Sequence, residues 1–157
     1  MIRRAKESDI PALGALLAQV LEVHRKGRPD IFKPGSRKYT DEELKAILAD
    51  EGKPVFVYEE NGEVFGYAFC IVKDEPETNN LFGRRVLYLD DLCVDERMRR
   101  RGIGKQLYEA VKEYAASGLF DALTLNVWHL NDDALAFYRS LGMEPLKTTM
   151  ETKIKKP

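Results

Sequence analysis

The sequence predicts a mixed α/β fold in which helices pack on a single sheet. Strand-like runs alternate with amphipathic helical segments along the chain, and residues 86–128 contain the order strand, helix, strand. A β-α-β unit of this kind places two parallel strands side by side. The chain has 157 residues, of which 44% are hydrophobic and 32% charged, so we expect one globular domain over residues 1–157.

The N-terminal part predicts one strand and two helices. Residues 2–6 form the expected first strand, and Ser8 is the expected N-cap of a helix that runs to about His24. Its apolar residues recur at three- and four-residue spacing: Ile10, Leu13, Leu17, Val20 and Leu21. Residues 25–39 hold two prolines and two glycines without periodicity and predict a loop.

The elements that follow have clear start and stop signals. Thr40 and Glu43 form a capping box for a second helix, which ends near Gly52. Asn61 and Gly62 predict a hairpin turn between two strands within residues 55–72. The remaining expected elements are a strand at 86–94, a helix from 103 to Gly118, a strand at 122–128, a helix at 131–142 with an Asn or Asp cap, and a last strand from Glu144.

Charge and cysteine content exclude several classes of function. The 25 Lys and Arg residues balance 26 Asp and Glu residues, which argues against a protein that coats nucleic acid or an anionic membrane. The N-terminus lacks the apolar stretch of an export signal, and no window is apolar enough to span a membrane. Cys70 and Cys93 lie in apolar runs without a metal-ligand pattern, so we expect a cytoplasmic protein with no metal site.

A basic, glycine-containing turn between the strand at 86–94 and the next helix predicts an anion site. Glycines let the backbone approach a ligand closely, and the first N–H groups of the helix point toward it. Five cations lie within nine residues: Arg97, Arg99, Arg100, Arg101 and Lys105. A phosphate group is the expected ligand, and a solvated charged turn is the alternative.

Two common phosphate loops do not fit this segment. A Walker A loop needs Gly at the position of Arg99 and Ser or Thr at the position of Gln106. A dinucleotide fingerprint needs Gly at the position of Leu107.

The segment and its surroundings instead resemble the GNAT superfamily of acetyl-CoA-dependent N-acetyltransferases. The family pattern Arg/Gln-x-x-Gly-x-Gly/Ala matches Arg99–Gly104, and its later Asn matches Asn131. The pattern Tyr-x-x-x-Gly-Phe matches Tyr138 onward, with Met143 in place of Phe. The expected order β-α-α-β-β-β-α-β-α-β also resembles the family, in which the two central parallel strands splay into a V, usually with the help of a bulge.

The resemblance implies a set of residues that bind acetyl-CoA. The backbone of Leu92, Cys93 and Val94 would contact the pantetheine arm and the acetyl carbonyl, and Asn131 would bind pantetheine. The pyrophosphate would be held by the basic turn, whose members are Arg99, Arg100, Arg101, Gly102, Ile103, Gly104 and Lys105. Tyr138 would lie near the sulfur and assist departure of the thiolate; its alternative role is that of a core aromatic.

Acetyl transfer requires a neutral amine, and therefore a proton acceptor. Asp90 is the first candidate, because the segment LYLDDLCV resembles the corresponding strand of polyamine-type acetyltransferases. Side chains alternate along a strand, so we expect Asp90 and Asp91 to face opposite sides and only one to enter the site. His24 and His129 are further candidates. Cys93 lacks an evident partner base, which favours direct transfer over an acetyl-cysteine intermediate.

The acceptor is the least constrained part of the prediction. The loop at 25–39 carries six cations and one acid, a net charge of +5, which opposes a polycationic acceptor. We expect a small-molecule or peptide amine, with a homodimer as one possible assembly. The competing hypotheses are a non-catalytic domain that binds CoA or a partner protein, and nucleic-acid binding through the arginine run, which the balanced charge disfavours.

Overall fold

The computed structural model describes residues 1–156 and confirms the predicted mixed α/β class. The described chain contains five strands in one sheet and four α-helices. It forms two compact units, one from Met1 to Asn126 and one from Val127 onward. The first unit holds the whole sheet and three of the helices.

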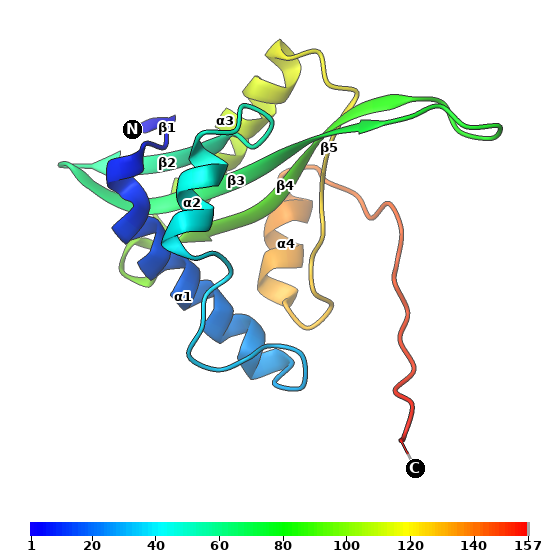
Figure 1. The fold of residues 1–157 in the computed structure, drawn as a ribbon, viewed down its shortest axis with the longest axis horizontal. Coiled ribbons are helices and arrows are strands. Elements are labelled where there is room, and N and C mark those ends of the chain that lie inside the picture. The colour runs from blue at the N-terminus through cyan, green and yellow to red at the C-terminus, as the bar shows by residue number, and fades with distance from the viewer. Residues whose placement is uncertain (157) are drawn as a thin grey trace. The chain divides into compact units, whose positions relative to one another are not determined.

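The sheet has its strands in sequence order, β1-β2-β3-β4-β5. Their bounds are β1 Ile2–Arg4, β2 Val55–Glu60, β3 Glu63–Glu75, β4 Arg84–Val94 and β5 Ala122–Leu125. The first four strands are antiparallel neighbours, while β4 and β5 are parallel. Asn61 and Gly62 form the β2–β3 turn with positive φ angles of 54° and 82°, as their sequence predicts. Figure 1 shows β3 and β4 as the long central pair.

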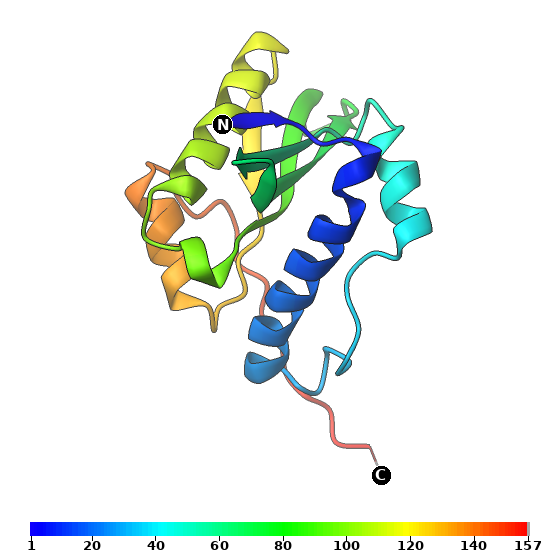
Figure 2. The same cartoon turned by 90° about the vertical axis from the view of Figure 1, so that its left-hand side faces the viewer.

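Helices cover both faces of this sheet (Figure 2). On one side lie α1, Ile10–Gly27, and α2, Asp41–Leu48, and on the other lies α3, Ile103–Ser117. A core cluster between these two helices and the sheet is formed by Ile10, Leu13, Leu16, Leu17, Leu44, Val55, Val57, Tyr67, Phe69 and Cys93. A short 3-10 turn at Glu7–Asp9 precedes α1, so the N-cap is Asp9 and not the predicted Ser8.

The face toward α3 requires close backbone contact. A Cβ atom built on Gly66 of β3 would lie 2.9 Å from the Cys93 carbonyl oxygen and 3.1 Å from a Leu107 methyl carbon. Ile103 and Leu107 are buried there, as expected for one of the amphipathic helices that the sequence predicts. Gly118 ends α3, also as predicted.

The second unit contains α4, Asp132–Ser140, with Asn131 as its N-cap. The strand predicted from Glu144 is absent, because residues 144–156 have no regular secondary structure. The large apolar residues of this segment, Leu146, Met150 and Ile154, are 72%, 86% and 82% exposed. A segment forms a strand where its residues fit a half-buried pleated surface beside a partner strand. In the described sheet β5 is an edge strand and pairs with β4 alone, so residues 144–156 have no partner strand there.

The capping box at the start of α2 stabilises the first turn of this helix. Thr40 accepts a hydrogen bond from the Glu43 backbone N–H, and Glu43 accepts one from the Thr40 N–H. We predict that Thr40→Ala lowers the free energy of unfolding by about 1 kcal/mol, and that Thr40→Ser, which retains the acceptor oxygen, loses much less. Urea denaturation of both variants checks this, and equal losses would contradict a capping role.

Candidate active site

One extra residue in β4 shapes the centre of the sheet. Phe69 of β3 pairs with Asp91, while the next residue, Cys70, pairs with Leu89. Asp90 is therefore left without a partner in the ladder, which is the arrangement of a β-bulge. A bulge breaks the alternation of side chains, so two consecutive residues can point to the same side.

Asp90 receives two donors from the segment that precedes α2. The Tyr39 hydroxyl donates to Oδ2 of Asp90 at 2.7 Å, and Nζ of Lys38 lies 2.7 Å from the same oxygen. The Asp90 side chain is 13% exposed, against 41% for Lys38. The carboxylate thus lies at the boundary of the core, and the lysine covers it from the solvent side.

Asp91 faces the same aromatic cluster as Asp90. The Tyr67 hydroxyl donates to Oδ2 of Asp91 at 3.0 Å, and the rings of both Tyr39 and Tyr67 contact the ring of Phe69. Burial raises the pKa of Asp91 to about 6, and the charge of Lys38 and the Tyr67 hydroxyl oppose that shift. The prediction that the two aspartates face opposite sides was wrong, because the bulge interrupts the period of the strand.

The bulge also marks the point where the two parallel strands part. Pairing between β4 and β5 runs from Val86 opposite Ala122 to Leu89 opposite Leu125 and stops there. From Asp91 to Val94, the residues of β4 pair with β3 only. One backbone edge of Leu92, Cys93 and Val94 is therefore unpaired within the sheet and able to bind a ligand.

The side chain of Cys93 lies away from that edge. Its thiol is 4% exposed within the α1 face of the core and contacts the Leu16 carbonyl oxygen at 3.7 Å. Burial raises the pKa of this thiol to about 12. Cys93 thus contributes backbone groups to the candidate site, and its thiol is unsuited to nucleophilic catalysis.

The basic turn is fixed to the sheet by Asp95, a buried residue that the sequence patterns did not single out. Its carboxylate accepts hydrogen bonds from the Arg97 backbone and side chain at 2.9 to 3.0 Å, which lower the pKa of Asp95 to about 2. The Asp95 N–H donates to the Phe65 carbonyl oxygen at 2.8 Å. Arg97 is therefore occupied by a structural ion pair, leaving the later arginines to face a ligand.

The backbone after Arg99 is arranged as an anion site. Arg100 and Gly102 have left-handed φ angles of 62° and 75°, and no side chain caps the N-terminus of α3. In contrast, Thr40 caps α2 and Asn131 caps α4. The N–H groups of the first turn, beginning at the buried Ile103, are thus available to an anion.

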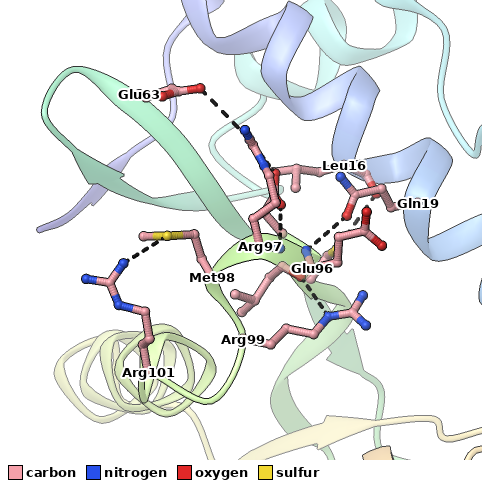
Figure 3. Close-up of polar contacts among 11 residues, drawn as sticks. Leu16, Gln19, Glu63, Glu96, Arg97, Met98, Arg99 and Arg101 are labelled. Atoms are coloured by element: carbon pink, nitrogen blue, oxygen red, sulfur yellow. Dashed lines mark hydrogen bonds and ion pairs between the residues drawn. The ribbon is translucent and has the colours of Figure 1, made fainter.

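The cations of this turn surround the helix start. Arg99 donates to the Val94 carbonyl oxygen at 3.3 Å. Arg101 lies 3.4 Å from a Glu60 carboxylate oxygen, and its guanidinium also contacts the Met98 sulfur (Figure 3). Arg100 and Lys105 are exposed. The predicted set from Arg99 to Lys105 is therefore gathered around one helix terminus, which fits a pyrophosphate group.

Asn131 and Tyr138 lie at the two ends of α4 in the second unit. Oδ1 of Asn131 accepts a hydrogen bond from the Ala134 N–H at 3.1 Å, so the predicted Asn cap is confirmed. Tyr138 is half-buried, and its ring contacts that of Phe137. The Tyr138 carbonyl oxygen accepts from Leu141 and Met143, which closes the helix.

The two histidines differ in their surroundings. His24 lies in the last turn of α1 against the ring of Phe32, and burial together with the charge of Lys38 lowers its pKa. His129 is exposed in the second unit. The charge of Lys38 thus acts on both His24 and the aspartate pair. The hydrogen bond of Lys38 goes to Asp90.

The structure adds Lys38, Tyr39 and Tyr67 to the predicted site residues. The first two belong to the loop whose high positive charge was visible in the sequence, while Tyr67 is an ordinary core position of β3. Within residues 1–156 no three His, Cys, Asp or Glu side chains gather as a metal site. None of the helices described is both long and apolar enough to cross a membrane.

Comparison with known proteins agrees with this geometry. The family model described as "Acetyltransferase (GNAT) family" matches residues 17–143. The uncharacterized N-acetyltransferase YhfO of Bacillus subtilis is 32% identical over 143 residues, covering 91% of this chain and 89% of YhfO. A crystal structure of a mutant of the BH1408 protein from Bacillus halodurans superimposes with a TM-score of 0.95 at 35% identity, covering 99% of each chain.

A more distant structure shares the fold. The aminoglycoside N-acetyltransferase AAC(6')-Iy, solved in complex with CoA, has a TM-score of 0.73 at 17% identity, covering 99% of this chain and 100% of the other. The chain therefore belongs to the acetyltransferase (GNAT) family.

Proposed function

We propose that this protein transfers the acetyl group of acetyl-CoA directly to a primary amine of a small molecule or peptide. The observation that carries the proposal is the bulge in β4. It places Asp90 and Asp91 beside the unpaired strand edge at Leu92–Val94. A few residues later the chain reaches the N-terminus of α3, which no side chain caps and which cations surround. One end of this segment suits a cationic amine, and the other suits the phosphates of CoA.

The donor is assigned to the cationic end. Arg99–Gly104 and Lys105 hold the pyrophosphate, the unpaired backbone edge at Leu92–Val94 holds the pantetheine arm, and Asn131 adds a hydrogen bond to it. AAC(6')-Iy, which shares the fold, was solved with CoA, and this supports CoA chemistry for the family architecture. Acetyl-CoA supplies a thioester whose carbonyl carbon accepts the amine.

The aspartate pair is assigned to the amine. An alkylammonium has a pKa near 10.4, so freeing the amine at pH 7 costs about 4.6 kcal/mol. Asp91, whose pKa is raised to about 6, binds the acceptor's ammonium and accepts its proton more readily than an ordinary aspartate, while Asp90 adds negative charge beside it. The gain over an unperturbed carboxylate is about 3 kcal/mol in proton affinity.

Tyr138 is assigned to the leaving group. When the tetrahedral intermediate collapses, the thiolate departs, and a phenol that donates a proton lowers the energy of that step. The high pKa of the Cys93 thiol agrees with direct transfer to the amine.

We further propose that residues 1–157 act as one domain in the cytoplasm, which fits two buried, unpaired cysteines.

A thiol-release assay tests this function. Purified protein is incubated with acetyl-CoA and a panel of amino acids, peptides, aminoglycosides, monoamines and polyamines, and free CoA is measured. We expect release that depends on at least one amine. If no amine supports release while acetyl-CoA still raises the melting temperature, the protein is a binding domain and the proposed activity is wrong.

The leaving-group role of Tyr138 predicts a selective kinetic defect. Tyr138→Phe should lower kcat by about 10²-fold or more while changing acetyl-CoA affinity by less than about threefold, because only the proton donor is lost. Phe137→Leu, at the adjacent position of α4, is the control for a general packing effect. An unchanged kcat in Tyr138→Phe would remove this residue from the mechanism.

The raised pKa of Asp91 predicts a pH dependence. Protonation of Asp91 at low pH removes the proton acceptor, so kcat/KM should fall as pH decreases through about 6. Asp91→Asn should lower kcat/KM at pH 8 and abolish this acidic limb.

The same substitution has an opposite effect on stability. A carboxyl whose pKa is raised by folding costs stability above that pKa, and the cost disappears as pH falls below it. Asp91→Asn should therefore stabilise the protein at pH 8 by roughly 1–3 kcal/mol more than at pH 4. Thermal unfolding at both pH values measures this, and equal effects would contradict a perturbed Asp91.

A further inference from the structure

The acidic pair of the candidate site already holds one cation of the protein. Nζ of Lys38 lies 2.7 Å from Oδ2 of Asp90, and the charge of Lys38 also acts on Asp91. The Lys38 ammonium thus takes the place that an acceptor's ammonium would take on Asp90. Lys38 is reached from solvent, since 41% of its side chain is exposed.

Neighbouring residues fix the position of Lys38. On one side, Tyr39 donates to Asp90 and packs its ring against Phe69, with centroids 5.7 Å apart. Thr40 then caps α2, and Arg37 forms an ion pair with Asp41 in its first turn. A lysine held between such anchored neighbours loses little further entropy when it pairs, unlike an isolated surface lysine.

The remaining charges of the site can be counted. Asp90 and Asp91 contribute two negative charges at most, and Lys38 contributes one positive charge. Asp90, Asp91 and Lys38 together therefore carry at most one unbalanced negative charge.

We propose that Lys38 determines which acceptors the site takes: by occupying one carboxylate of the pair, it selects amines with a single positive charge over diamines and polyamines. The inference rests on the proposed function and narrows its substrate class. A second ammonium on the acceptor would meet Lys38 in place of a free carboxylate, and like charges in a partly buried site repel strongly. Removal of the lysine charge frees Asp90 for that second ammonium.

Matched acceptors and variants test this selection. n-Butylamine and putrescine differ in one terminal ammonium, and spermidine adds a third amine. We expect Lys38→Met to raise the ratio of kcat/KM for putrescine to that for n-butylamine about fivefold or more, the equivalent of one additional ion pair. Lys38→Arg keeps the charge and should keep the wild-type ratio. Lys45→Met removes an exposed lysine paired with Glu7 and should also leave the ratio unchanged.

A binding measurement separates this inference from the proposed function. Calorimetry of spermidine with each protein in the absence of acetyl-CoA should show tighter binding to Lys38→Met than to wild type, with no change in Lys45→Met. If amines are turned over but neither the ratio nor spermidine affinity changes in Lys38→Met, the role of Lys38 is wrong. If no protein releases CoA, the proposed function fails, and the spermidine affinities alone decide whether Lys38 occupies a cation site.

Discussion

The single unpaired residue in β4 is the constraint on which the candidate site depends. A strand in regular register would send Asp90 and Asp91 to opposite faces and would keep its pairing with β5 beyond Leu89. The bulge changes both features together, because an inserted residue turns the side chains and bends the strand. The carboxylate pair and the backbone edge at Leu92–Val94 that β5 leaves unpaired are therefore two results of one local irregularity.

Two adjacent carboxylates near a core require compensation. The cluster supplies it through the Tyr39 and Tyr67 hydroxyls and the Lys38 ammonium, while Phe69 packs between the two tyrosine rings. Each donor satisfies an oxygen that would otherwise lose its hydration without replacement. The pKa of Asp91 is nevertheless raised, which shows that desolvation outweighs the donors at that position.

The sequence was informative where the structure depends on neighbours along the chain. The capping box at Thr40, the turn at Asn61 and Gly62, and the arginine turn before Ile103 are local features, and the structure has all three. The Lys38–Asp90 contact joins residues 52 positions apart, and the bulge depends on the register with β3, so neither has a local signal. The strand predicted from Glu144 is absent for the same reason, because pairing with a neighbouring strand is not a local property of the sequence.

The nearly neutral total charge of the chain conceals a charge separation along one continuous segment. Acids at the bulge of β4 are followed within about ten residues by the arginines that surround the start of α3. Under the proposed function the donor is anionic and the acceptor cationic, so opposite charges at the two ends would direct each substrate to its own side. Such charges would neutralise each other if the chain between them were free to fold back. Asp95 prevents this, because its backbone is bonded to Phe65 and its carboxylate to Arg97, which fixes the position where the sign of the charge changes.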